Sequence, residues 1–382
     1  MIVDRDTLGV RPIAAGLLDA LAQMHARDVD WSNELVRHVV EIKSAQPVSD
    51  LAWLPACFHD EIVAANAILT GENARLMPTA MHPFMDPNRD ATLWDGEIYH
   101  TYDRIYGCKG HGWSNLQSMH VNLPFADDAQ FARLHAAIRL VLPLLPALAA
   151  SSPIVDAAPS GLLDSRLDVY RSICSITPSV AGQVIPETVE TRAEYEAKIL
   201  RPMYAEIARF DPERVLQFEW LNSRGAIARF DRSAIEIRVI DVQECPQVDL
   251  AIAAAAAGVV KSLYDERYAP LDEQQEIGID VLHDVLLASI RDADRAVVDD
   301  ADYLHALGMP QSRCAASDVW ASLLHDLDPA HAWWQPTIDT ILREGPLARR
   351  ILRAVGSDAS RDRIAEVYRA LCACLEDGRM FV

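Results

Sequence analysis

The sequence offers no organised cysteine motif. Its seven cysteines, among 382 residues, are scattered and show no C-x-x-C spacing. That spacing is typical of structural zinc sites and thioredoxin-like redox motifs, while disulfide frameworks belong mainly to short secreted chains. We therefore expect reduced thiols, with Cys372 and Cys374 filling space in a helix.

Basic residues and long apolar runs are also scarce. Lys and Arg number 35 against 56 Asp and Glu, which gives a formal net charge of −21. This excess of acid argues against a protein that holds nucleic acid through phosphate contacts. The first 25 residues contain no basic segment followed by an apolar one, and no uninterrupted apolar run reaches the length that a bilayer needs. These absences predict a cytoplasmic protein with neither a nucleic-acid nor a membrane partner.

Common catalytic signatures are missing as well. The sequence contains no G-x-S-x-G nucleophile elbow, no H-E-x-x-H pair and no protein-kinase set. Three glycines occur within residues 107–112, but their spacing matches neither a P-loop nor a dinucleotide-binding fingerprint. About half of the residues are apolar, which is enough for a large core. Without repeats or a low-complexity linker, we expect one α+β domain, with a core in residues 1–270 and a helical portion in residues 271–382 packed on it.

The segment from 226 to 243 combines an apolar and a charged face. If it forms one strand, alternation places Ile235, Ile237 and Val239 on one side. The other side then carries Arg232, Glu236 and Arg238. A carboxylate between guanidinium groups suits a site for Mg²⁺ and phosphate, but a solvated sheet face tolerates the same pattern. Spacing alone leaves both interpretations open.

Two further strand-like segments repeat this design. In residues 116–123, His120 and Asn122 share one face, where they can touch a metal or nucleotide together or simply be solvated. In residues 33–43, Glu34 and Glu41 are seven positions apart, so an unbroken strand would send them to opposite faces. Both can serve one site only if Glu34 lies in the turn before the strand or a bulge intervenes.

The three segments would form a site if they were neighbours in one sheet. The acids and His120 would then converge to hold a divalent ion, and Arg238 would pair with an oxyanion. Phosphoryl chemistry, a metal-dependent hydrolase acting without ATP, and a mixed sheet with a merely polar surface all remain open at this point.

Several quoted segments resemble one known family. They are Q-S-M-H-V-N-L-P, A-D-D-A, G-L-L-D-S-R and, above all, A-R-F-D-R-S-A-I-E-I-R-V-I-D-V-Q. In order and spacing they look like the glutamate–cysteine ligase type 2 family of carboxylate–amine ligases, with a fainter likeness at G-P-L-A-R-R-I-L. The resemblance implies a glutamine-synthetase-like fold, in which an antiparallel sheet forms a funnel that holds Mg²⁺ and ATP, and helices pack outside. It implies activation of a carboxylate, usually that of glutamate, as an acyl phosphate that an amine attacks.

The resemblance also assigns roles to individual residues. Glu34 and Glu41 would hold one Mg²⁺, and His120 with Glu236 would hold another. Arg238 would neutralise the γ-phosphate during transfer. These roles agree with general chemistry, because a dissociative phosphoryl transfer is stabilised mainly by metal ions and arginine.

Three residues receive secondary roles from the same resemblance. Asn122 and Arg232 would line the nucleotide or acyl-phosphate region, and Arg166 would bind the carboxylate of the substrate. The implied cofactors are ATP and Mg²⁺, and the implied partners are a small amino acid and an amine. The identity of the amine is left open, and so is assembly into a homo-oligomer.

The chain departs from the family at its start. Members typically open with a strand G-x-E-x-E-Y before a segment like M-I-V-D, whereas this sequence begins with M-I-V-D. The two additional metal glutamates would therefore lie upstream of this chain or be lost from it. Loss would imply an impaired or non-catalytic relative that acts as a binding or assembly protein.

Overall fold

The computed structural model describes residues 1–24, 28–327 and 333–382. It mixes helices with small antiparallel sheets, and the central sheet has the order β5–β9–β8. Its strands are β5 (Ser118–Pro124), β9 (Ala234–Asp241) and β8 (Ala226–Arg229). Four two-stranded sheets accompany it, formed by β1 (Ile2–Asp4) with β4 (Ala74–Leu76), β2 (Val29–Asn33) with β3 (Val40–Ser44), β6 (Ile154–Val155) with β7 (Ala158–Pro159), and β10 (Val297–Val298) with β11 (Cys314–Ala315). The α+β class is confirmed at this level, and the funnel-shaped sheet stays a prediction.

The segment 226–243 is a hairpin and not one strand, so that interpretation of the sequence was wrong. Residues 230–233 form the turn between β8 and β9, where Ser233 adopts a positive φ of 51°. The polar residues D-R-S that follow Phe230 are typical of a turn, and they interrupt the alternation that the rest of the segment suggests. Arg232 therefore lies in the turn, while Glu236 and Arg238 keep their places on β9.

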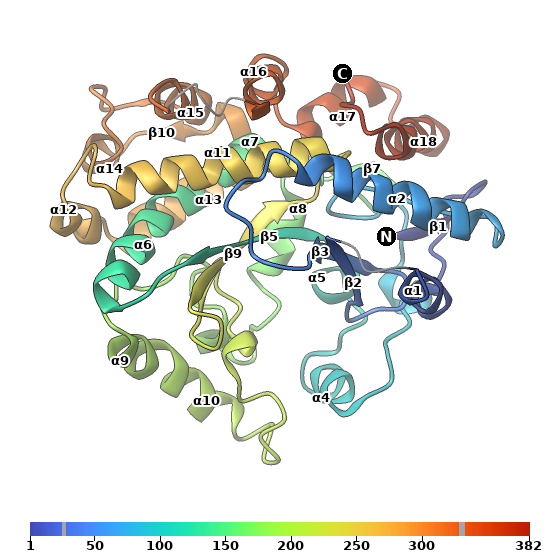
Figure 1. Ribbon diagram of the computed structural model, residues 1–382, viewed down its shortest axis with the longest axis horizontal. Helices are drawn as coiled ribbons and strands as arrows, with labels where there is room; N and C mark the ends of the chain where they lie inside the picture. The colour runs from blue at the N-terminus through green and yellow to red at the C-terminus, as the bar shows by residue number, and fades with distance from the viewer. Residues whose placement is uncertain (25–27, 328–332) are drawn as a thin grey trace.

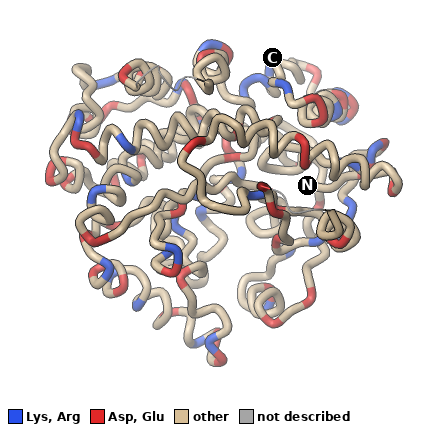
Figure 2. Tube along the Cα trace, in the orientation of Figure 1, with Lys and Arg blue, Asp and Glu red and all other residues tan. Residues whose placement is uncertain are grey.

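Helices cover the upper side of the central sheet in the view of Figure 1. This layer contains α6 (Asp128–Val141), α7 (Leu145–Ala149), α11 (Pro246–Tyr264) and α13 (Ile279–Asp292). The lower part of the view holds α4 (Glu97–Tyr106), α9 (Arg192–Tyr195) and α10 (Arg201–Ile207), the last two joined by a π-helical turn at Glu196–Leu200. Acidic and basic residues are interspersed over both parts (Figure 2).

The remaining helices lie around this centre. They are α1 (Ala14–Ala22), α2 (Leu54–Thr70), α3 (Pro87–Asp90), α5 (His111–Ser114), α8 (Ser165–Tyr170), α12 (Leu271–Glu276), α14 (Ala301–Ala306), α15 (Ala316–His325), α16 (Gln335–Glu344), α17 (Leu347–Val355) and α18 (Arg361–Asp377). The last four form the upper edge in Figure 1, and α18 packs against α2.

Prolines split the long helix that follows β5. Pro143 lies in a 3₁₀ turn, Leu142–Leu144, and Pro146 lies at the start of α7. Two distant side chains form hydrogen bonds with backbone carbonyls of this split helix. The Tyr303 hydroxyl donates to the Leu140 carbonyl at 2.6 Å, and Trp320 Nε1 donates to the Leu144 carbonyl at 2.8 Å.

Two helical stretches among the described residues, Asp128–Ala149 and Pro246–Tyr264, are long and apolar enough to cross a membrane. However, 94% and 61% of these stretches are buried inside the structure. Core helices of globular proteins have the same composition, so this length alone is weak support for a span.

One hydrophobic cluster connects the two portions that the sequence predicts. It includes Phe131 and Ile237 from the first portion and Leu286, Trp320 and Ile341 from the second. The predicted boundary at residue 270 lies between α11 and α12 and crosses this cluster. The division into two portions stays a prediction.

Candidate functional site

A cavity of about 1030 Å³ lies between the central sheet, the β2–β3 pair and the helices α4, α5 and α8. Eight residues singled out from the sequence line it, namely Glu34, Glu41, His120, Asn122, Arg166, Arg232, Glu236 and Arg238. The strand residues among them belong to two sheets and not to one, because β2 and β3 pair only with each other among the described strands. Glu34, Arg166 and Arg232 lie outside the strands, in a loop, on α8 and in a turn. Convergence therefore results from the packing of separate elements around one space.

Glu236 is the centre of the charged part of the cavity. Its side chain is only 5% exposed, and Arg238 Nε lies 2.9 Å from its Oε1. Arg229 Nη1 lies 3.3 Å from Oε2, and His120 Nδ1 lies 3.5 Å from Oε1. Burial alone would raise the pKa of Glu236, but Arg238, His120 and Arg229 outweigh it and hold the pKa below its ordinary value. Glu236 is therefore ionised at neutral pH.

The sequence analysis missed Arg229, which binds both Glu236 and Asp231. Its contact with Asp231 is bidentate, at 3.1 and 2.9 Å. Arg229 lies on β8, where Ile227 is the register partner of Glu236. Treating residues 226–243 as one strand hid this neighbour, because only the hairpin brings β8 beside β9.

His120 lies at an irregularity in the sheet. The pairing of β5 with β9 shifts between Met119 and Val121, which is the mark of a β-bulge. His120 Nε2 is 2.9 Å from Ser118 Oγ, and Asn122 is the register partner of Glu236. Burial and the nearby Arg238 lower the pKa of His120 to about 4, so its imidazole is neutral and able to coordinate a metal at neutral pH.

Glu34 and Glu41 meet the condition set by their spacing, because Glu34 lies in the loop after β2 and before β3. Glu41 Oε2 accepts hydrogen bonds from Ser32 Oγ at 2.5 Å and from Lys43 Nζ at 3.0 Å. No described residue forms an ion pair with Glu34. Its side chain is exposed toward the cavity yet surrounded by protein, and this desolvation together with Glu41 raises its pKa to about 7.

These residues fit a metal ion only in part. Two neighbouring carboxylates, one of them without a fixed cation, suit a hard cation that completes its shell with water and phosphate oxygens. Both oxygens of Glu236, in contrast, already contact arginines. Across the described ranges, no group of three or more His, Cys, Asp or Glu side chains is arranged to hold a metal. The Glu34–Glu41 pair is thus the better fit, and metal ligation by His120 and Glu236 stays a prediction.

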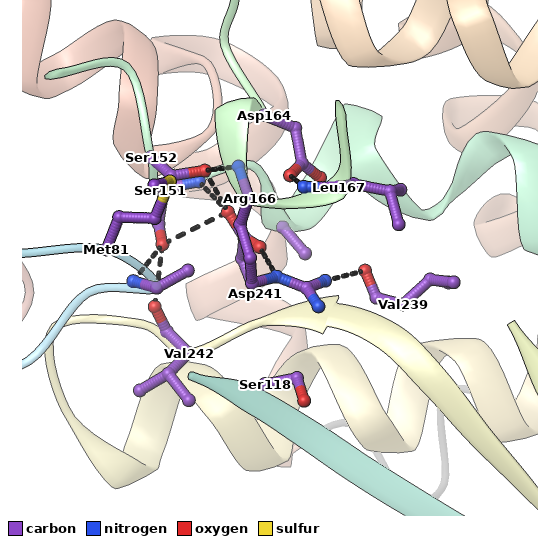
Figure 3. Close-up of polar contacts among 12 residues, drawn as sticks. Met81, Ser118, Ser151, Ser152, Asp164, Arg166, Leu167, Val239, Asp241 and Val242 are labelled. Carbon is purple, nitrogen blue, oxygen red and sulfur yellow. Dashed lines mark hydrogen bonds and ion pairs between the residues drawn. The ribbon is translucent and has the colours of Figure 1, made fainter. Parts of the chain in front are cut away.

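Arg166 belongs to a buried network beside the cavity (Figure 3). Its Nε donates to the carboxylate of Asp241, and its Nη2 donates to the Val239 carbonyl at 2.7 Å. Asp241 also accepts hydrogen bonds from the Ser151 backbone at 2.8 Å and the Ser152 hydroxyl at 2.9 Å. Burial and Asp241 raise the pKa of the adjacent Asp164 well above its usual value. Asp241 already neutralises Arg166, and the role of Arg166 with a substrate carboxylate stays a prediction.

Arg232 has the most solvent contact of the predicted basic residues. Its side chain is 58% exposed, and its Nε lies 3.8 Å from Asp231. Its position in the β8–β9 turn places it on the lining of the cavity without a close ion pair.

Aromatic residues form another wall of the cavity. This aromatic wall consists of Tyr99 and Tyr102 on α4, Trp113 on α5, Tyr170 on α8 and Trp220 in the 3₁₀ turn Glu219–Leu221. Tyr102 has its ring centroid 5.2 Å from that of Trp113 and 6.1 Å from that of Trp220. The sequence analysis gave these residues no role. The signal was the three-residue spacing of Tyr99 and Tyr102, which places both rings on one helix face.

Comparison with known proteins identifies related chains. The profile of "Glutamate-cysteine ligase family 2 (GCS2)" matches residues 2–370. An uncharacterized protein of Archaeoglobus fulgidus is 30% identical over 91% of this chain and 88% of its own length. A protein of Salinispora tropica, provisionally named glutamate–cysteine ligase 2, is 25% identical over 67% of this chain and 62% of its own. One of the same provisional name from Cupriavidus metallidurans is 30% identical over 44% of each chain.

The profile match covers nearly the whole chain, and it spans both the central hairpin and the C-terminal helices up to α18. It includes every residue that the sequence analysis placed in the site. The chain belongs to glutamate–cysteine ligase family 2.

Proposed function

We propose that the protein is an ATP-dependent carboxylate–amine ligase, with glutamate as its acid and cysteine as only one candidate amine. The observation that carries this proposal is the shared cavity, whose lining includes the carboxylates of Glu34 and Glu41 and the guanidinium group of Arg238, which is held by Glu236. A site for a nucleotide triphosphate and its cation needs both kinds of charge in one space. Family membership supports the same reaction class.

The proposed reaction has two balanced steps. In the first, a carboxylate oxygen of the acid attacks the γ-phosphorus of ATP, the bond to the β-phosphate oxygen breaks, and ADP leaves. In the second, the amine nitrogen attacks the carbonyl carbon of the acyl phosphate, the bond to the phosphate oxygen breaks, and inorganic phosphate leaves. The ammonium form of the amine releases two protons in total, one to the departing phosphate and one to solvent.

The residues of the chain supply positioning and charge for these steps. Arg238, fixed by Glu236 and by the Asn222 carbonyl at 3.0 Å, would face the transferring phosphate. Asn122 and Arg232 would line the nucleotide or acyl-phosphate region, and Glu34 and Glu41 would hold Mg²⁺. The metal supplies neutralisation of phosphate charge when bound. The small-molecule substrates and a cytoplasmic location belong to the same proposal.

One observation favours a second candidate, an impaired relative that binds ligands without turnover. The oxygens of Glu236 are engaged by two arginines, and within the described residues no third acidic or histidine side chain completes a metal cluster. A binding or assembly protein would tolerate such a site, whereas Glu236 could ligate a metal only after one of these arginines gave up its contact.

Phosphate release distinguishes the two candidates. Purified protein is incubated with ATP and Mg²⁺ and a panel of amino acids and amines, and inorganic phosphate is measured. A ligase releases phosphate only when both an acid and an amine are present, together with an equal amount of amide. Absence of stimulation by every combination would reject the ligase. Hydrolysis of an amide in the absence of ATP would instead indicate a metal-dependent hydrolase.

A further inference from the structure

The aromatic wall extends from the interior of the cavity to the surface. Trp220 stacks on Phe218 with ring centroids 5.5 Å apart and planes 10° from parallel, and Phe218 is 54% exposed. Trp113 stacks in turn on Tyr106 at 5.1 Å. Such packed rings form a rigid apolar surface that can receive another flat or bulky group. A ligand entering along Phe218 would therefore meet aromatic faces before it meets charge.

The aromatic wall also adjoins the charged part of the site. Arg238 Nη1 donates to the carbonyl of Asn222, which lies two residues beyond Trp220. Tyr170 and Tyr102 are close enough to affect Arg238 electrostatically. Burial would lower the pKa of Arg238, but Tyr170, Glu236 and Tyr102 raise it above its ordinary value. The wall thus begins beside the group that would face the transferring phosphate.

Charge pairing limits what the wall can bind. Four Lys or Arg side chains line the described part of the cavity. Lys43, Arg166 and Arg238 are paired with Glu41, Asp241 and Glu236. Arg232 is exposed in the β8–β9 turn, 3.8 Å from Asp231, and is not part of the wall. The wall itself contributes only phenol and indole rings. A substrate carboxylate placed there would be desolvated without a cation, which is costly, whereas an ammonium group is attracted to aromatic faces.

We propose that the aromatic wall binds the amine substrate, and that this amine carries an aromatic or other bulky apolar group and no carboxylate. The inference rests on the proposed ligase function and specifies its second substrate. An adenine ring is a poorer occupant, because two phosphates and a ribose separate it from the γ-phosphate, while the wall starts at Arg238. The amine nitrogen, in contrast, must reach the acyl phosphate directly.

The first test compares amines in the phosphate-release assay with ATP and glutamate. The panel contains 2-phenylethylamine, cysteine and methylamine. We expect kcat/KM for 2-phenylethylamine to exceed that for cysteine by about tenfold or more, because burial of the phenyl group on the wall adds apolar contact. A preference for cysteine would overturn the inference and leave the ligase function intact.

The second test uses Trp220→Ala. We expect KM for 2-phenylethylamine to rise about tenfold or more, with KM for ATP and for methylamine unchanged. Trp220→Phe should keep most of the affinity and guards against a folding defect. The matched control is Trp53→Ala, since Trp53 is 39% exposed just before α2 and outside the cavity lining. A rise in KM for ATP alone would assign the wall to adenine and overturn the inference.

A binding measurement keeps the inference testable if turnover is absent. Calorimetric titration of the wild type and of Trp220→Ala with 2-phenylethylamine should show binding by the wild type that weakens about tenfold in the variant. If no combination of acid and amine stimulates phosphate release but this binding occurs, the ligase function is rejected, while binding of an aromatic amine by the wall is supported. If neither protein binds 2-phenylethylamine, the inference fails.

Discussion

At the scale of single residues, Glu236 determines the charge balance of the site. It is buried between Arg229, Arg238 and His120, so its replacement leaves two guanidinium groups with less compensation. We expect Glu236→Gln to raise the Mg²⁺ concentration needed for half-maximal phosphate release. We also expect it to lower the free energy of unfolding by about 3 kcal/mol, as typical when one partner of a buried ion pair is removed. Mg²⁺ titration and urea unfolding measure these effects.

Glu213→Gln serves as the control for this variant, because Glu213 is exposed outside the cavity. An unchanged Mg²⁺ titration in Glu236→Gln would remove Glu236 from the metal site and leave it as an anchor for the two arginines.

Arg238 is the residue on which phosphoryl transfer is expected to depend. Arg238→Ala should lower the rate of phosphate release about 10²–10³-fold, since it removes a fixed positive charge from the transition state. Cooperative unfolding should persist, because Glu236 keeps Arg229 and His120 as neighbours. Arg238→Lys keeps the charge but not the guanidinium geometry, so its rate of phosphate release should lie between those of the wild type and Arg238→Ala. Loss of the cooperative transition in Arg238→Ala would show that the residue is structural.

The residues that sequence analysis found and missed differ in one respect. Glu236, His120 and Arg238 stand out because alternation within their own strand exposes them. Arg229 acts across a hairpin, and Asp241 acts on Arg166 through an interaction 75 residues away in sequence. Such contacts depend on register and packing, which no spacing rule within one segment reveals.

At the scale of elements, Gly225 allows the central hairpin to pack closely. A Cβ atom at this position would lie 2.6 Å from Val239 Cγ1 and 3.3 Å from the Val184 carbonyl oxygen. Gly225 also accepts a hydrogen bond from the Arg238 backbone at 2.8 Å. We expect Gly225→Ala to lower the free energy of unfolding by about 1–3 kcal/mol and to reduce phosphate release through displacement of β9.

Gly16→Ala is the matched control for this prediction. Gly16 lies within α1, and a Cβ there meets nothing within 4 Å, so alanine should maintain or raise stability. Equal stabilities of wild type and Gly225→Ala in thermal unfolding would contradict the predicted crowding at the hairpin.

Asp249, in the first turn of α11, should make the free energy of unfolding depend on pH. Asp249 lines the cavity, and desolvation by the surrounding protein raises its pKa to about 7. A group whose pKa is raised on folding binds its proton more tightly in the native state, so its contribution falls as pH rises from about 4 to about 7. In the wild type, the Gln243 backbone N–H donates to Asp249 Oδ1 at 2.9 Å. Asp249→Asn keeps an oxygen acceptor for this bond but removes the carboxylate that titrates. The melting temperature of the variant minus that of the wild type should therefore increase from pH 5 to pH 8. A difference that stays constant over this range would contradict the raised pKa of Asp249.

Element boundaries can be understood from the sequence where local chemistry sets them. The split of the helix after β5 follows from Pro143 and Pro146, and the loop position of Glu34 was one of the two arrangements that its spacing allowed. The hairpin turn at residues 230–233 was missed, because apolar and polar residues continue to alternate on its far side. The separation of β2–β3 from the central sheet could not be predicted, since it depends on long-range packing alone.

At the scale of the whole molecule, the C-terminal helices complete the core. The largest hydrophobic cluster joins Phe131 and Leu148 to Leu286, Trp320 and Ile341. We expect residues 1–270 produced alone to lack a cooperative thermal transition, because the missing helices would leave this cluster exposed to water. Circular dichroism during heating, with the full chain as reference, measures the transition. A sharp transition in the fragment would establish residues 1–270 as an independent domain.

The long-range contacts of the split helix affect the order in which the chain can reach its native structure. The carbonyls of Leu140 and Leu144 receive their hydrogen bonds from residues 163 and 176 positions further along. During synthesis on the ribosome, the helix pair α6–α7 is therefore finished long before its partners Tyr303 and Trp320 emerge. Until then the hydrogen bonds of Tyr303 and Trp320 to this helix pair cannot form, and contacts of such long separation form slowly. The helix layer above the central sheet therefore reaches its native contacts only after α14 and α15, which carry Tyr303 and Trp320, have been synthesised.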